Sequence, residues 1–110
     1  MGRKKHLRVK ALVDMGATLT VLPKRLAEEL EIEPVSTEQV MTGAGPVRVE
    51  RGRAWIKLGG KEEAFPVWIS SFVDKVLLGV VVLESLGFEV DPTTGTLREK
   101  PLLMYSQEAH

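Results

Sequence analysis

The chain contains no cysteine, which excludes disulfide bonds, thiolate metal ligands and thiol catalysis. It has no excess of charge, since 15 Lys and Arg side chains balance 15 Asp and Glu, and this balance would attract neither nucleic acid nor acidic lipid. No apolar run reaches the roughly 18 residues of a membrane helix, and no hydrophobic signal core follows the basic start. We therefore expect a cytoplasmic protein with no nucleic-acid or membrane partner.

Histidine and aromatic residues are also few. The two histidines, His6 and His110, lie at opposite ends of the chain without clustered partners, so neither a metal site nor a cofactor is expected. The basic stretch at residues 3–10 is more typical of a solvated terminus than of a nucleic-acid arm. Trp55 and Trp68 are expected to pack in a sheet rather than to stack on bases.

The 110 residues, 44% of them hydrophobic and 27% charged, are enough for one soluble domain with a modest core. We expect residues 1–110 to form this domain, with residues 1–6 flexible and residues 99–110 as a C-terminal strand or tail. Many short strands with glycine and proline turns predict an all-β, closed, barrel-like fold with one or two short helices. The predicted strands are residues 7–13, 18–21, 47–58, 63–69, 75–78, 88–91 and 96–98, and the predicted helices are residues 24–30 and 82–86.

Glycines mark two turns between these strands. Gly59-Gly60 predicts a tight hairpin turn between two apolar, β-prone segments. The stretch at residues 40–47, with Gly43 and Gly45, suits either a mobile hairpin or an ordinary surface turn. It does not match a dinucleotide-binding fingerprint, because Arg48 stands where a third glycine is needed. A nucleotide site is therefore not expected.

The most informative segment is Ala11-Leu12-Val13-Asp14-Met15-Gly16-Ala17-Thr18, where a carboxylate follows an apolar strand and precedes a glycine. An aspartate at the end of a core strand is partly desolvated, which needs a reason. Gly16 permits a tight turn and the close approach of a second chain or a substrate. Because Asp-X-Gly also occurs in ordinary turns, this segment alone leaves both a catalytic acid and a plain turn open.

A second segment agrees with the first. Residues 76–87 read as an apolar strand, a glycine and a short apolar helical turn, and residues 88–97 read as strand, turn and strand. Together with residues 19–23, this order resembles the retropepsin-like aspartic proteases over about residues 9–97. The resemblance implies an acid-protease (retropepsin) fold in a single-domain cellular or prokaryotic member, with Asp-Met-Gly in place of Asp-Thr/Ser-Gly.

The resemblance implies that Asp14 pairs with Asp14 of a second copy, because each chain of that family supplies one catalytic aspartate. The chain has a single Asp-X-Gly, and Asp74, which precedes an apolar run, is expected in a loop. Two close carboxylates share a proton, as in pepsin with pKa values of about 1.5 and 4.7, so one acts as base and the other as acid. The implied activity is that of a homodimeric aspartic endopeptidase acting on extended peptide or protein substrates.

The resemblance also implies which residues contact the substrate. The backbone around Gly16, Ala17 and Thr18 would frame the two aspartates and bind the substrate main chain. The segment Thr42-Gly43-Ala44-Gly45 holds the position of the flap that closes over bound peptide, excludes water and completes the site.

Three departures from the family pattern favour an alternative, a retropepsin-like dimerisation or peptide-binding module with weak or no catalysis. Met15 stands where the family has a threonine or serine whose hydroxyl makes cross-subunit hydrogen bonds, and a thioether cannot donate one. Val80 and Val81 follow Gly79, where relatives often carry a polar residue that ties the helix to the active-site loop. The amino end before Asp14 is also shorter than the hairpin that usually leads into the catalytic strand.

Overall fold

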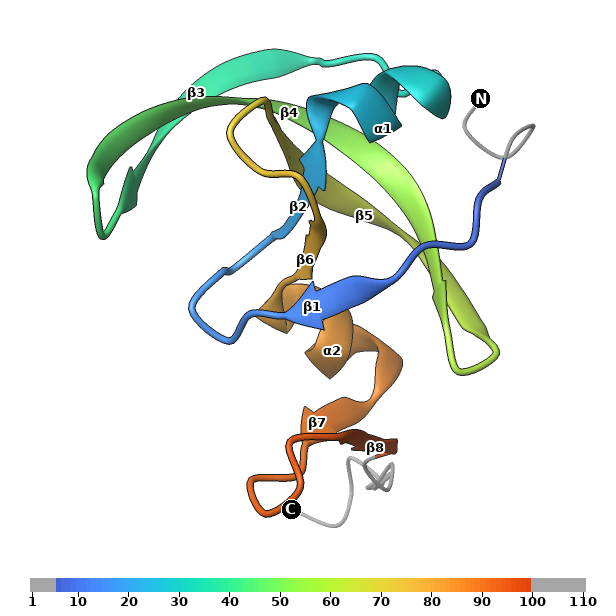
Figure 1. The fold of residues 1–110 in the computed structure, drawn as a ribbon. Helices are drawn as coiled ribbons and strands as arrows, with labels where there is room; N and C mark the ends of the chain where they lie inside the picture. The colour runs from blue at the N-terminus through green and yellow to red at the C-terminus, as the bar shows by residue number, and fades with distance from the viewer. Residues whose placement is uncertain (1–5, 100–110) are drawn as a thin grey trace, which may run out of the picture.

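A computed structural model describes residues 6–99, and Figure 1 shows its fold. Predictions for residues 1–5 and 100–110, which include most of the flexible start and of the tail, lie outside this range. Neither helix in the described range has the length and apolarity that crossing a membrane requires. The elements are β1 (Ala11–Val13), β2 (Thr20–Pro23), α1 (Lys24–Glu29), β3 (Ser36–Thr42), β4 (Gly45–Leu58), β5 (Lys61–Ser70), β6 (Val76–Leu78), α2 (Val80–Leu86), β7 (Phe88–Val90) and β8 (Leu97–Glu99).

Six strands form one sheet in the order β1-β6-β2-β5-β4-β3, and β7 pairs with β8 in a separate two-stranded sheet. The β1–β6 and β2–β5 pairs are parallel, whereas the other pairs are antiparallel. The large sheet curls into a half-barrel with β1 and β3 at its edges (Figure 1). The predicted all-β, barrel-like fold with one or two short helices is confirmed, although the sheet is a half-barrel rather than the closed barrel that was predicted.

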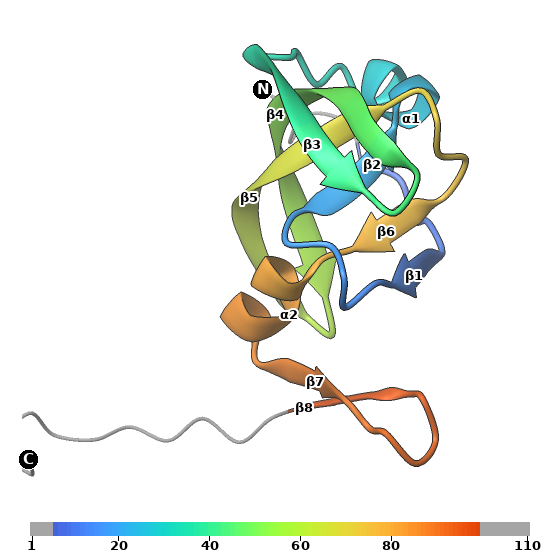
Figure 2. The same ribbon diagram turned by 90° about the vertical axis from the view of Figure 1, so that its left-hand side faces the viewer.

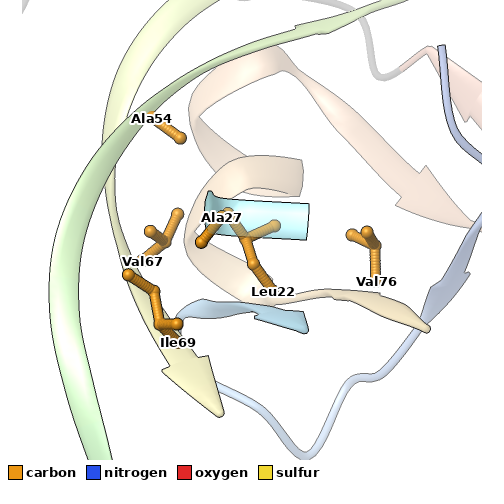
Figure 3. Close-up of a cluster of buried hydrophobic side chains, with 6 residues drawn as sticks. All are labelled: Leu22, Ala27, Ala54, Val67, Ile69 and Val76. Carbon is orange, nitrogen blue, oxygen red and sulfur yellow. The ribbon is translucent and has the colours of Figure 1, made fainter. Parts of the chain in front are cut away.

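One face of the curled sheet carries the core, because alternate residues of a strand point to the same side. Thr20 and Leu22 of β2 are opposite Val67 and Ile69 of β5, and all four side chains are buried. Figure 3 shows Ala27 of α1 among the apolar members of this cluster. A second cluster lies where α2 packs on the sheet, and it consists of Phe65, Leu78, Val82, Leu83 and Leu86.

The opposite face, which we call the open face, carries a stripe of side chains that crosses five strands. Leu12 of β1 is opposite Leu77 of β6, which is opposite Val21 of β2. Val21 is opposite Trp68 of β5, and Trp68 is opposite Arg51 of β4. Leu12 is 54% exposed, and the other four are half-buried. A mainly apolar surface therefore runs from the end of β1 to the base of the β3–β4 hairpin.

One predicted strand start is wrong by four residues and one strand is missing from the prediction, for reasons that lie in pairing. The predicted strand at residues 7–13 is reduced to Ala11–Val13, because its partner β6 has only three residues. The strand predicted from residue 18 begins at Thr20, and the helix predicted from residue 82 begins at Val80. The sequence does not predict β3, whose mostly exposed Ser36–Thr42 becomes a strand by pairing with β4 along its whole length. The other ends agree within two residues.

Gly59 and Gly60 form the predicted tight turn between β4 and β5, with positive φ angles of 59° and 83°. This turn packs against β7, since a Cβ at Gly59 would lie 2.5 Å from Phe88 Cζ, whereas a Cβ at Gly60 would meet no atom within 4 Å. Lys61 adds to the contact, because its Nζ donates to Leu86 O at 3.0 Å and lies 5.3 Å from the Phe88 ring centroid. The turn thus holds the β7–β8 hairpin against the large sheet.

Replacing Gly60 with alanine is expected to lower the free energy of unfolding by about 1 kcal/mol, because a residue with a Cβ must then adopt a positive φ. Gly59→Ala carries the same backbone penalty and must also displace the Phe88 ring, so its loss should be clearly larger. Urea unfolding of both variants at one protein concentration measures the difference. Equal losses would contradict the packing of Phe88 against this turn.

Candidate active site

The loop between β1 and β2 presents Asp14 directly after β1. The Asp14 N–H donates to Leu78 O at 3.0 Å, which extends the pairing of β1 with β6 by one residue. Ala17 N donates to Asp14 O at 3.0 Å, and Gly16 N donates to Asp14 Oδ1 at 2.9 Å. An aspartate that accepts from the N–H two residues later forms an Asx turn. The backbone of the loop therefore orients the Asp14 carboxylate.

Asp14 lies beside the stripe on the open face. It follows Leu12 by two residues, so the alternation of the strand directs both side chains to the same side of the sheet. Asp14 is half-buried, and within residues 6–99 its carboxylate accepts the Gly16 hydrogen bond and forms no ion pair. A Cβ at Gly16 would lie 3.3 Å from Asp14 Oδ1. Glycine therefore lets the backbone approach the carboxylate and leaves its other oxygen open.

The same loop holds the start of α2. The N–H groups of Val80 and Val81 donate to the carbonyl oxygens of Ala17 and Thr18 at 2.9 and 3.1 Å. N–H groups in the first turn of a helix have no partner within the helix, and Gly79 provides no side-chain cap. The Asp14 loop therefore caps α2, and the two valines tie the helix to the loop through their backbone rather than through a polar side chain.

Gly79 lies directly against the backbone of the loop. A Cβ at this position would come within 2.5 Å of Leu19 C and 2.7 Å of Thr18 O, so the close approach requires glycine. The Gly79 N–H donates to Thr20 Oγ1 at 3.0 Å, and Thr20 is 0% exposed. Thr20 was not among the predicted site residues, although a hydroxyl residue two positions before Leu22, on an otherwise apolar face, is a signal in the sequence.

Met15 lies between Asp14 and Gly16 with its side chain 58% exposed. The hydrogen bonds that brace the loop within one chain are made by the backbone, by the Asp14 carboxylate and by Thr20. The side chain of Met15 therefore lies at the surface and takes no part in these hydrogen bonds.

The predicted flap residues form the tip of the β3–β4 hairpin. Thr42 pairs with Gly45, and Thr42 Oγ1 donates to Gly45 O at 2.7 Å and accepts from Ala44 N at 3.1 Å. In Figures 1 and 2 this hairpin extends on the same side of the molecule as the loop between β1 and β2. The predicted site residues thus fall into two groups, the loop at residues 14–18 and the tip at residues 42–45, both on that side.

The other two aspartates of the chain lie elsewhere. Asp74 is exposed in the connection between β5 and β6, where the sequence predicted a loop. Asp91 belongs to the turn of the β7–β8 hairpin, where its Oδ1 accepts from Thr93 N at 2.8 Å. In the described range no three His, Asp or Glu side chains gather in a way that could hold a metal ion. Asp14 is therefore the one aspartate beside the open face.

Two hollows mark the surface away from Asp14. One, of about 350 Å³, lies near the base of the β3–β4 hairpin and is lined in part by Lys24, Glu50 and Phe72. The other, of about 780 Å³, lies between Trp55 and the segment that leads to β1. The Asp14 loop lines neither of them. In a single chain the Asp14 carboxylate thus lies on an open surface rather than in either hollow.

The chain matches one protein-family model and several solved structures. Residues 3–90 match the family model described as aspartyl protease, while none of the curated proteins matches the chain. The EIAV protease complexed with the inhibitor HBY-793 is similar in structure, with a TM-score of 0.64, 21% identity, and coverage of 72% of this chain and 77% of that chain. This likeness confirms the retropepsin-like fold.

Two cellular proteins have similar structures at 25% identity. A retropepsin-like aspartic protease from Rickettsia conorii has a TM-score of 0.59, with coverage of 77% of this chain and 68% of that chain. The retroviral protease-like domain of Ddi1 from Leishmania major has a TM-score of 0.56, with coverage of 86% and 80% respectively.

Replacing Thr20 with valine is expected to lower the free energy of unfolding by about 1–3 kcal/mol, because the buried Gly79 N–H then loses its acceptor. Thr20→Ser keeps the hydroxyl, so it should avoid most of the loss that valine causes and lose only the contribution of one methyl group. Urea unfolding of both variants is the measurement. A valine variant as stable as the wild type would show that this hydrogen bond does not hold the loop.

Proposed function

Because the chain belongs to the retropepsin-like aspartyl protease family, we propose that it is a homodimeric aspartic endopeptidase that hydrolyses extended polypeptides. The proposal rests above all on Asp14. Its carboxylate lies half-buried on the open face, oriented by the Gly16 N–H and free of any ion pair with the described residues. Two copies that met at this face would bring two such carboxylates together.

The proposed chemistry follows from the pairing. Two carboxylates at close range cannot both ionise easily, so the pair holds one proton. The ionised Asp14 takes a proton from a water molecule, and the water oxygen attacks the scissile carbonyl carbon. The protonated Asp14 of the other subunit gives its proton to the carbonyl oxygen. The tetrahedral intermediate then collapses: one of its hydroxyl groups gives a proton to the ionised carboxylate, the C–N bond breaks, and the leaving nitrogen takes the proton held by the other carboxylate, so the dyad again holds one proton. No covalent enzyme adduct forms.

Exposed apolar side chains around Asp14 support association of two copies. Leu12 is 54% exposed and Met15 is 58% exposed in the single chain, and the two flank Asp14 in the sequence. Apolar surface next to a functional group is typical of an interaction site, because covering it removes that surface from water. In the dimer the backbone of residues 16–18 would bind the substrate main chain, and residues 42–45 would close over it.

Met15 also supports a second candidate, a dimerisation or peptide-binding module with weak catalysis. A threonine or serine at this place could donate a hydrogen bond that a thioether cannot, and its absence is worth on the order of 1 kcal/mol per subunit. The loop is nevertheless braced by the Ala17 and Thr18 carbonyls and by Thr20, none of which involves side chain 15. A flexible thioether can also fill a gap by packing. These contacts favour the peptidase.

The decisive experiment is cleavage of an unstructured peptide pool between about pH 4 and 7, at concentrations that favour a dimer. Wild type should cleave, and Asp14→Asn should lose at least about a hundredfold in rate, since acid–base catalysis contributes 10² to 10⁴. Asp74→Asn, which alters an exposed loop aspartate, is the matched control and should cleave as wild type does. A confirmed dimer that does not cleave would move the assignment to the binding module.

Replacing Met15 with threonine tests whether the natural loop limits activity. We expect kcat/KM to change by less than about tenfold, because one hydrogen bond contributes roughly 0.5–1.5 kcal/mol. Met15→Leu keeps an apolar side chain of similar size and serves as the control. A gain of more than a hundredfold in the threonine variant alone would show that the natural chain is catalytically impaired.

A further inference from the structure

A three-residue cluster lies at the base of the β3–β4 hairpin. Glu38 of β3 accepts from Arg51 Nε at 2.6 Å and Nη2 at 3.3 Å, and from Trp68 Nε1 at 2.8 Å. Arg51 belongs to β4 and Trp68 to β5, where the two are directly opposite each other. The Glu38 carboxylate therefore reaches across β4 and joins the edge strand of the hairpin to a strand inside the sheet.

The cluster lies on the same face as Asp14. Arg51 and Trp68 are the last two members of the stripe that begins at Leu12. Glu38 follows Ser36, which is opposite Arg51, by two residues, so it points to that face as well. The cluster thus stands at one end of the open face, and the Asp14 carboxylate stands at the other.

Both oxygens of Glu38 are already used. Oε2 accepts from Arg51 Nε, while Oε1 accepts from Arg51 Nη2 and from Trp68 Nε1. A carboxylate with three donors and an arginine within reach gains little from an additional cationic substrate group. The cluster is therefore better suited to holding strands together than to binding a charged substrate side chain.

Toward the tip, the hairpin has no such tie. Among the described residues, the side chains of residues 39–48 make no hydrogen bond or ion pair to the rest of the sheet, and the Thr42 hydroxyl bonds within its own turn. A second link between the hairpin and the rest of the protein lies just after that segment. There Lys24 Nζ of α1 is 3.4 Å from Glu50 Oε1 of β4, which makes an ion pair. The hairpin is thus linked by side chains to the rest of the protein at residue 38 of β3 and at residue 50 of β4, and the residues between them have no such link among the described residues.

We propose that Glu38 is a positioning residue that pins the base of the hairpin to β5, so that residues 39–48 alone form the moving part of the lid over the substrate. The inference rests on the proposed peptidase function, in which the hairpin closes over bound peptide. A fixed base limits the positions that the tip can adopt above the open face. Closure over the substrate then costs less conformational entropy.

We call the hydrogen bonds from Arg51 and Trp68 to Glu38 the clamp. Electrostatics keep the clamp intact in mild acid. The hydrogen bond from Arg51, followed by that from Trp68, holds the pKa of Glu38 below its usual range. A carboxylate with a lowered folded-state pKa contributes above the ordinary glutamate value of about 4.3 and loses its contribution as pH falls through the lowered pKa. The clamp is therefore fully formed across most of the pH range in which cleavage is to be measured.

Hydrogen exchange of backbone amides tests the clamp directly. Glu38→Ala should speed exchange of amides within residues 39–48 by about threefold to tenfold, the factor expected for losing hydrogen bonds of this kind. Amides of β6 and α2 should exchange as in wild type. Trp68→Phe removes only the link to β5 and should reproduce part of the effect, whereas Glu38→Gln keeps an acceptor and should fall between wild type and Glu38→Ala.

Glu89→Ala is the matched control. Glu89 is also a strand glutamate that accepts from an arginine, Arg98 Nε at 2.8 Å, but it lies in the β7–β8 hairpin. Its loss should leave exchange in residues 39–48 unchanged. The clamp is overturned if Glu38→Ala and Trp68→Phe leave that segment unchanged, or if they speed exchange equally throughout the chain.

Cleavage kinetics then connect the clamp to the lid. Glu38→Ala should lower kcat/KM by about threefold to tenfold while Glu89→Ala keeps the wild-type value. An unchanged kcat/KM together with faster exchange would show that the hairpin base does not position the lid. Absence of cleavage by wild type would reject the peptidase instead, and the exchange data would still decide whether Glu38 pins the hairpin.

Discussion

The contact between Gly79 and the backbone of residues 18–20 is the constraint on which the rest of the site depends. It brings the end of β6 against the Asp14 loop so closely that a Cβ would overlap the Leu19 carbonyl group. The Thr20 hydroxyl accepts the Gly79 N–H, and the loop carbonyls accept the next two N–H groups at the start of α2. The Asp14 loop, β6 and α2 therefore hold one another in place, and together they fix the position of the Asp14 carboxylate.

The two faces of the curled sheet carry different sets of side chains. Residues such as Thr20, Leu22 and Val67 fill the core face and stabilise the fold by burial. Their alternate neighbours form the open face, which begins at Asp14 and ends at the cluster of Glu38, Arg51 and Trp68. Because successive side chains of a strand point to opposite faces, a residue that packs the core cannot also line the open face.

Much of this could be predicted from the sequence, and the failures have physical causes. The run that ends in Asp14-Met15-Gly16, the turn at Gly59-Gly60 and the apolar strand before Gly79 are local signals, and each is where it was expected. Strand β3 was missed because its exposed, mostly polar residues have no periodic pattern and become a strand only by pairing with β4. The roles of Thr20 and Glu38 were missed because their partners lie 59 and up to 30 residues away along the chain.

The sequence by itself determined the family, the mostly β fold and the candidate acid Asp14, because these follow from residue order, apolar runs and glycines that act over a few positions. The tertiary structure alone decided what braces that acid, which side chains share its face and where the hairpin is tied. Those features depend on strand register, and register is set by the packing of segments that are distant in sequence. No local pattern in the sequence records which residue of one strand will stand opposite a given residue of another.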